Sequence, residues 1–175
     1  MDWYSKVFEV IDMRSFSNLW FWIALAVSWS TASHYVLGVP FDMVARAARN
    51  GGQAEVDLED MARINANRLL FIAAEAGLWL AAIGSFLLAS LAILGFVYFI
   101  ELAQALFLLA LPMSFVTLLS VRTARLIDAG EGRGKPLRRR LTRHRLSVQV
   151  VGMISIFITA LWGMYMNMSV GPLGG

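Results

Sequence analysis

The chain has 175 residues, no cysteine and only two histidines. Without thiols it forms no disulfide, thiolate metal site or cysteine nucleophile, although this leaves its compartment undecided. His34 is the only histidine in an apolar run, and His144 lies among arginines. One chain therefore does not supply the two intramembrane histidines that bis-histidine haem ligation needs, and we expect no cofactor.

The sequence also lacks a phosphate-binding loop, zinc-ligand spacing and a serine-triad arrangement. Met164, Met166 and Met168 are weak metal candidates, because alternating thioethers in an extended segment bind Cu(I). On a helix those sulfurs point apart, and no outward-facing histidine or cysteine completes a site. We therefore expect a protein that is not an enzyme and holds no metal.

Charge is nearly absent from four long apolar runs, and 58% of the residues are hydrophobic. Each run reaches the ~20 residues that a helical membrane span needs. The predicted fold class is all-α, an integral membrane bundle of four transmembrane helices in a single domain. The predicted spans cover about residues 19–38, 69–94, 96–121 and 146–165.

Thirteen of the fifteen Lys and Arg residues lie in two of the gaps between these runs, residues 39–68 and 122–145. Basic residues in short loops are retained on the cytoplasmic side during insertion. Both gaps are therefore predicted to be cytoplasmic loops, with both termini on the outer side.

Three shorter features complete the predicted architecture. Residues 1–14 carry an apolar face typical of an interfacial helix on the outer leaflet, or of a helix packed on the protein itself. In the first loop, a helix from Phe41 to Arg49 and a second one running into the next span form a cytoplasmic hairpin. That hairpin is either a docking surface or an ordinary solvated connection. Gly95 is the predicted turn between the second and third spans.

Small residues recur every four positions along three of the spans, which allows helix backbones to approach closely. These helix-packing seams serve internal packing or contact with another subunit. Their members are Ala24, Ser28 and Ala32; Ala73, Gly77, Ala81, Ser85 and Ala89; and Ser155, Thr159 and Gly163.

Glu75 and Glu101 are the only charged residues between Leu69 and Val121. A charge in hydrocarbon is costly unless it is neutralised, paired or hydrated, so both are candidates for an intramembrane polar site. Glu75 lies about 9 Å from the cytoplasmic end of its span, and His34 reaches nearly the same depth. The most specific contact that the sequence predicts joins His34 and Glu75. This pair is either proton-responsive or purely structural.

Glu101 and Gln104 lie one helical turn apart. The predicted depth of Glu101 is about 8 Å from the outer surface. They either line an outward polar crevice or hydrogen-bond to neighbouring helices.

A basic cluster precedes the last span and makes anionic lipid a predicted partner, although its charges also act as the topology signal. Nucleic acid is not expected, because no aromatic or glycine-rich RNA motif accompanies the cluster. The candidate lipid contacts are Arg138, Arg139, Arg140, Arg143 and Arg145.

Three segments resemble a known family: DMRSFSNLWFW from Asp12, HYVLGVPFDM from His34 and GGQAE from Gly51. The chain is similar to small, uncharacterised alphaproteobacterial multi-span membrane proteins often labelled "component of SufBCD complex". The resemblance implies a bacterial inner-membrane protein and an association with iron–sulfur cluster assembly. Together with the arginine distribution, this predicts a multi-pass protein with both termini periplasmic. The chain itself has no cysteine to hold a cluster and no ATP-binding loop.

Two functions fit these observations. The leading hypothesis is a non-catalytic accessory, scaffolding or assembly subunit of a larger membrane complex, with other membrane proteins or copies of itself as partners. The alternative is a small oligomeric transporter or channel that uses the intramembrane residues His34, Glu75 and Glu101.

Overall fold

The computed structural model describes residues 15–169, and nearly all of this part is helical, which confirms the all-α prediction. The predicted interfacial helix at residues 1–14 lies outside the described residues. Five α-helices follow a short 3-10 turn. The elements are η1 (Ser15–Ser17), α2 (Leu19–His34), β1 (Tyr35–Val36), β2 (Val39–Pro40), α3 (Phe41–Asn50), α4 (Gln53–Phe96), α5 (Glu101–Leu126), the π-helical turn η2 (Ile127–Glu131) and α6 (Gly134–Ser169).

Three of these helices, α4, α5 and α6, are long and apolar enough to cross a membrane. The first predicted span is shorter than expected, because α2 has 16 residues. At 1.5 Å per residue it is about 24 Å long, less than the ~30 Å hydrocarbon core. The structure thus supports a helical membrane protein with three candidate spans.

The prediction that the first span continues to Gly38 is wrong, because the chain leaves the helix after His34. Tyr35 pairs with Pro40 and Val36 with Val39 in a small antiparallel hairpin. Leu37 and Gly38, at its tip, have φ values of 55° and 72°. Two consecutive positive φ angles make a tight hairpin turn that a helix cannot contain.

The turn between α4 and α5 is not at Gly95. Helix α4 continues to Phe96, and the turn occupies residues 97–100, where Phe99 has a φ of 57°. Gly95 is instead a site of close approach between two helices. A Cβ atom there would lie 3.0 Å from the backbone nitrogen of Gln104.

The predicted hairpin of two helices in the first loop is present. Helix α3 ends at Asn50, before Gly51 and Gly52, and α4 begins at Gln53. Both glycines have positive φ angles, which end one helix and begin the next. Helix α4 then runs without a break for 44 residues into the apolar region.

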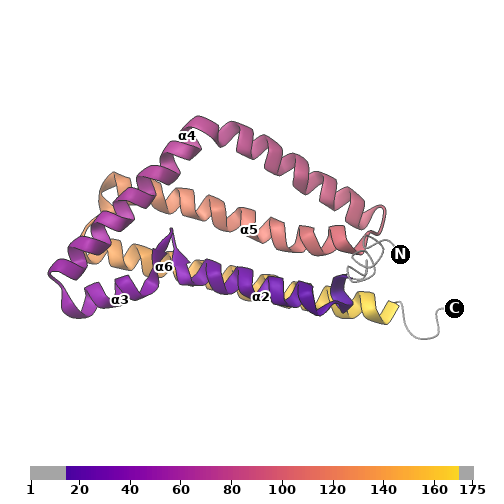
Figure 1. Ribbon diagram of the computed structural model, residues 1–175. Helices are drawn as coiled ribbons and strands as arrows, with labels where there is room; N and C mark the ends of the chain where they lie inside the picture. The colour runs from indigo at the N-terminus through magenta and orange to yellow at the C-terminus, as the bar shows by residue number, and fades with distance from the viewer. Residues whose placement is uncertain (1–14, 170–175) are drawn as a thin grey trace, which may run out of the picture.

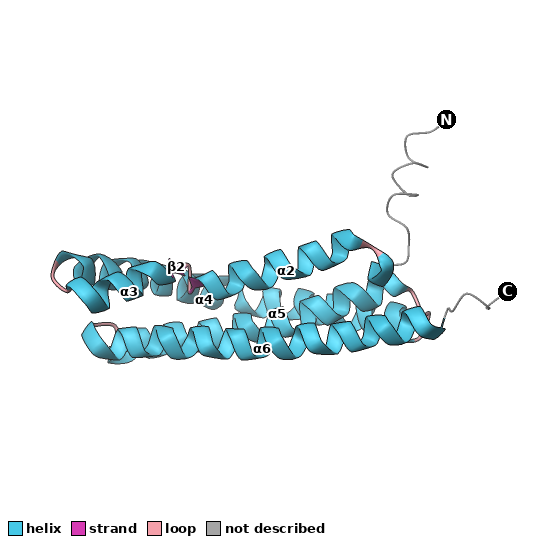
Figure 2. Cartoon of the chain, turned by 90° about the horizontal axis from the view of Figure 1, so that it is seen from below, coloured by secondary structure: helices cyan, strands magenta, loops and turns pink. Residues whose placement is uncertain are grey.

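The molecule has two regions, which we call the head and the apolar bundle. The head comprises α3, η2, residues 53–70 of α4 and residues 134–145 of α6; the apolar bundle comprises α2, α5 and the remainders of α4 and α6. In the bundle, α5 lies between α4 and the pair formed by α2 and α6 (Figure 1). Figure 2 shows α2 running along α6, with α3 beyond the end of α2.

The head contains the larger buried core. Its members come from the β-hairpin, α3, α4, α5, η2 and α6, and Leu58, Leu137 and Leu141 are fully buried among them. A smaller cluster in the bundle joins Leu25 and Trp29 of α2 to Val148 of α6. Both clusters leave the apolar half of α4 uncovered.

Helix α4 bends and then lies apart from α5 over much of its apolar half (Figure 1). No residue in its most apolar 18-residue stretch is buried, compared with 17% in α5 and 28% in α6. A Cβ atom added at Gly77 or Gly84 would meet nothing within 4 Å. Apart from the close approach at Gly95, this half of α4 therefore buries little of its surface against the rest of residues 15–169.

Candidate functional site

The candidates Glu101 and Gln104, in the first turn of α5, are both engaged by the chain itself. Glu101 Oε1 accepts a hydrogen bond of 2.7 Å from the backbone N–H of Phe16. The buried Gln104 side chain donates from Nε2 to the carbonyl oxygen of Gly95 at 2.8 Å. Its Oε1 accepts from the indole N–H of Trp162 at 3.0 Å. These two residues join η1, the α4 end and α6 to α5, so the structure gives them the predicted role of hydrogen-bonding to neighbouring helices.

The other predicted pair, His34 and Glu75, is not formed within the chain. Both side chains are exposed, and no hydrogen bond or ion pair joins them among residues 15–169. His34 contacts the ring of Tyr35 edge-on, with centroids 4.9 Å apart. The two residues have similar predicted depths but lie on helices that do not pack together.

Helix periodicity explains why these two side chains do not meet. His34 is about 180° around α2 from the buried Leu25, and Glu75 is about 140° around α4 from the buried Ala62. Each residue therefore lies on the face of its helix opposite the protein core. The sequence indicated the depth of each residue, but not the direction in which each helix turns its buried face.

The small-residue seams have different surroundings on different helices. On α6, Ser155, Thr159 and Gly163 are all buried, and a Cβ atom at Gly163 would lie 3.2 Å from the Phe16 ring. On α2, Ser28 and Ala32 are half-buried and Ala24 is exposed; on α4, Ala73 and Gly77 are half-buried and Ala81, Ser85 and Ala89 are exposed. The α6 seam thus packs internally, whereas most of the α4 seam is exposed in the described part of the chain.

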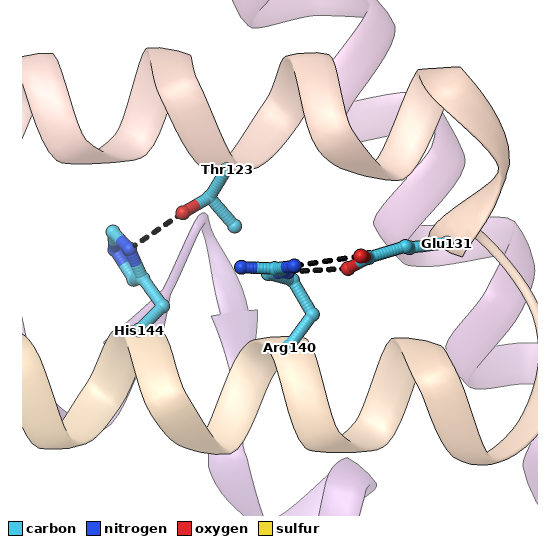
Figure 3. Close-up of polar contacts among 4 residues, drawn as sticks. All are labelled: Thr123, Glu131, Arg140 and His144. Atoms are coloured by element: carbon cyan, nitrogen blue, oxygen red, sulfur yellow. Dashed lines mark hydrogen bonds and ion pairs between the residues drawn. The ribbon is translucent and has the colours of Figure 1, made fainter.

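Sequence reasoning missed a buried histidine where the head meets the bundle. His144 is 5% exposed. Its Nδ1 lies 3.0 Å from Thr123 Oγ1, and its Nε2 lies 3.3 Å from Ser120 Oγ (the Thr123 contact is drawn in Figure 3). Burial lowers the pKa of the His144 imidazole. The neighbouring arginines suggested a solvated loop, and only the position of α5 shows otherwise.

The predicted lipid-contacting arginines fall into two groups. Arg138 pairs with Glu55 of α4, Arg140 holds both carboxylate oxygens of Glu131, and Arg145 lies 3.9 Å from the centre of the Phe41 ring. Figure 3 shows the Arg140 and Glu131 side chains pointing toward each other. These three arginines therefore hold the head together.

Arg139 and Arg143, the remaining two, are exposed and line a shallow pocket of about 270 Å³. The hydrogen bond from Arg140 lowers the pKa of the Glu131 carboxyl in this pocket, so Glu131 stays ionised and paired. The full lining is Glu131, Lys135, Pro136, Arg139, Arg140 and Arg143. After the Glu131 charge is offset by Arg140, the pocket keeps three positive charges.

The methionine candidates lie on a helix rather than in an extended segment. Met164 and Met168 of α6 are 61% and 70% exposed. Successive members of the run lie about 200° apart around the helix, so the alternating arrangement needed for Cu(I) is not formed. Within residues 15–169, no group of three or more His, Asp or Glu side chains is placed to hold a metal ion.

Comparisons with protein-family models, with curated proteins and with solved structures find no match to this chain.

Proposed function

We propose that this chain is a non-catalytic accessory, scaffolding or assembly subunit of a membrane complex. The observation that carries the proposal is Glu75, an exposed carboxylate on a membrane-length apolar helix with no partner in the described chain. Lipid satisfies the apolar side chains around it, but a charge in hydrocarbon remains costly. A chain that leaves such a group uncovered is completed by protein contacts outside itself.

The head supports the same proposal from the other end of the molecule. Its core and its ion pairs are formed within one chain, so its outer surface is available for other contacts. Exposed charged residues of α3 and α4, including Asp42, Arg46, Asp57 and Asp60, cover this surface. We propose that it is cytoplasmic and docks an unlike subunit.

The proposed location is the bacterial inner membrane, with α2 as a fourth span and both termini periplasmic. The arginine distribution supports this orientation. Because the chain has no cysteine, single cysteines introduced by Asp128→Cys in η2 and Val97→Cys in the turn before α5 report on it cleanly. An impermeant maleimide should label Val97→Cys in intact cells, and Asp128→Cys only after the inner membrane is opened. The reverse pattern would invert the proposed orientation.

The decisive test of the accessory function is purification of the intact complex in mild detergent, followed by mass spectrometry. A stoichiometric unlike membrane or cytoplasmic protein is the expected result. Recovery of this chain alone, in every detergent and at native expression, would contradict the proposal.

One observation keeps a transporter as the second candidate. His34 and Glu75 remain exposed in the apolar bundle and can face a hydrated pathway formed between copies of the chain, whereas Glu101 is bound to the Phe16 backbone. Flux through reconstituted protein should then be lost in Glu75→Gln and retained in a variant of an exposed head residue, Arg46→Gln. Unchanged flux in Glu75→Gln would exclude this carboxylate as an essential relay.

A further inference from the structure

We infer that two copies of this chain associate in the membrane, with α4 of each copy packed against α2 of the other and Glu75 bound to the second copy's His34. The inference rests on the proposed membrane placement of α2 and deepens the proposed function, because it names the protein that covers Glu75. In this contact the Glu75 carboxylate accepts a hydrogen bond from an imidazole N–H of His34. Both the neutral and the charged ring carry an N–H that can donate.

Glu75 has no such donor among residues 15–169 of its own chain. Its neighbours on the same face of α4 are apolar and exposed, among them Leu78 at 84% and Phe86 at 69%. Arg68, seven residues away on this face, is about 10 Å along the axis toward the head. The face is therefore an apolar surface with one unsatisfied carboxylate.

His34 is the complementary group on an equally uncovered face. The buried side of α2 carries Leu25 and Trp29, which pack on α5 and α6. The opposite side exposes Ile23 at 42% and Val27 at 58%, followed by His34 near the end of the helix. This face, too, is apolar with one polar group at its inner end.

One contact places both groups on the bundle side of a common level. Gly38, in the turn that follows α2, lies against α4, because a Cβ atom there would be 3.2 Å from Asn65 Nδ2. Glu75 is ten residues beyond Asn65, about 15 Å along α4 toward the apolar bundle. His34 also lies on the bundle side of Gly38, at the end of α2. A second copy at the same depth therefore brings its His34 within reach of Glu75.

Two-fold symmetry satisfies both groups at once. In an isologous dimer, contact of Glu75 with the second copy's His34 generates the reciprocal contact by the same rotation. Within one copy, α5 separates α4 from α2 and α6 (Figure 1), so the pair does not form there. The exposed small residues Ala82 and Ala89 lie within about 40° of Glu75 around the helix axis and allow a neighbouring helix to approach this face of α4 closely.

Disulfide trapping in native membranes tests this arrangement without interference from native cysteines. Val27 and Ala82 each lie seven residues toward the outer end from His34 and Glu75, on the same helix faces. Two versions of the full chain with different tags, one with Val27→Cys and the other with Ala82→Cys, are expressed together and oxidised. We expect a disulfide dimer that carries both tags. The matched control replaces Ala82→Cys by Leu111→Cys on α5, which is 48% exposed at a comparable depth and should give no such dimer.

A second experiment ties the contact to the two polar groups. Glu75→Gln and His34→Phe should each lower the yield of the Val27 to Ala82 disulfide several-fold, while the exchange of both residues, Glu75→His with His34→Glu, restores it. Size-exclusion profiles and thermal unfolding of each variant establish that it is folded. Equal disulfide yields in all variants, trapping of α4 to an unlike protein instead, or a monomer in every version would overturn the inference. Trapping to an unlike protein would leave the accessory function intact, whereas a dimer without unlike partners would support the inference and contradict that function.

Discussion

The head and the apolar bundle are built on the same long helices but are stabilised differently. In the head, α4 buries Leu58, Ala62 and Ala66 completely or nearly so. In the bundle, the same helix exposes Leu78, Trp79 and Phe86. Water forces the head to bury its apolar side chains, while lipid removes that requirement from the bundle. Among the described residues, the more extensive buried packing therefore lies in the head, while the apolar half of α4 stays exposed.

A pair of leucine substitutions gives the strongest test of the difference in packing between the head and the apolar bundle. Leu141→Ala removes a fully buried side chain from the head and should lower the free energy of unfolding by about 2–5 kcal/mol. Leu78→Ala, at a side chain that is 84% exposed on α4, should change it by less than about 0.5 kcal/mol. Thermal or denaturant unfolding in mild detergent measures both. Equal losses would mean that the head is not the more strongly packed region.

Two glycines of α4 extend the comparison into the bundle. Gly95→Ala places a Cβ atom 3.0 Å from the Gln104 backbone, so α4 and α5 must separate at a cost of about 1–3 kcal/mol. Gly77→Ala meets no atom within 4 Å and should be neutral, or stabilising by up to about 1 kcal/mol through helix propensity. The same unfolding assay applies. If Gly95→Ala is as stable as Gly77→Ala, the two helices do not approach closely at this point.

The junction between the two regions should respond to pH through His144. Burial lowers the pKa of this histidine in the folded protein, so the unfolded state binds the proton more readily. Stability should therefore be greatest with the imidazole neutral, and should fall as the pH drops through about 6.5 and below. His144→Gln keeps a hydrogen-bonding side chain without a titrating group and should flatten this part of the profile. Melting temperatures between about pH 8 and pH 5 provide the measurement; an unchanged slope in the variant would assign the effect to other groups.

The smallest expected effect concerns the basic surface of the head. Arg139→Gln and Arg143→Gln should each weaken binding to anionic vesicles by roughly 1 kcal/mol, about fivefold, because each removes one base near the membrane surface. Arg46→Gln on α3, whose arginine pairs with Asp42 at an exposed site, is the matched control. Co-flotation of the reconstituted or detergent-released protein with phosphatidylglycerol vesicles, at low and high salt, gives the affinities. An equal loss of affinity in the control would mean that the weaker binding comes from the change in net charge and not from the pocket.

Much of the secondary structure was predictable because its signals are local. The end of α3 follows from Gly51 and Gly52, and the length of the apolar runs predicts α4, α5 and α6. The end of α2 was misplaced, since the apolar residues Tyr35, Val36 and Leu37 continue the hydrophobic run while forming a hairpin. Hydropathy records that a residue avoids water, but not whether its backbone is helical.

The candidate site was less predictable, because it depends on contacts between distant segments. Glu101 and Gln104 were recognisable as polar residues in a span, but their partners Phe16, Gly95 and Trp162 are assigned only by folding. His144 looked solvated among arginines, yet the hydroxyls of Thr123 and Ser120 and the packing of α5 bury it. The spacing of residues in the sequence predicts on which face of a helix a side chain lies. Whether that face is buried depends on the neighbouring helix.

By itself, the sequence determined an all-α chain with long apolar helices, a strong asymmetry of basic residues and a few ionisable groups at stated depths. These properties depend on composition and periodicity along one segment at a time. Only the tertiary structure decided that Gln104 and Glu101 are engaged internally, that His144 is buried, and that His34 and Glu75 face away from the core. The physical reason is that burial and pairing belong to two surfaces in contact, and those surfaces lie far apart in the sequence.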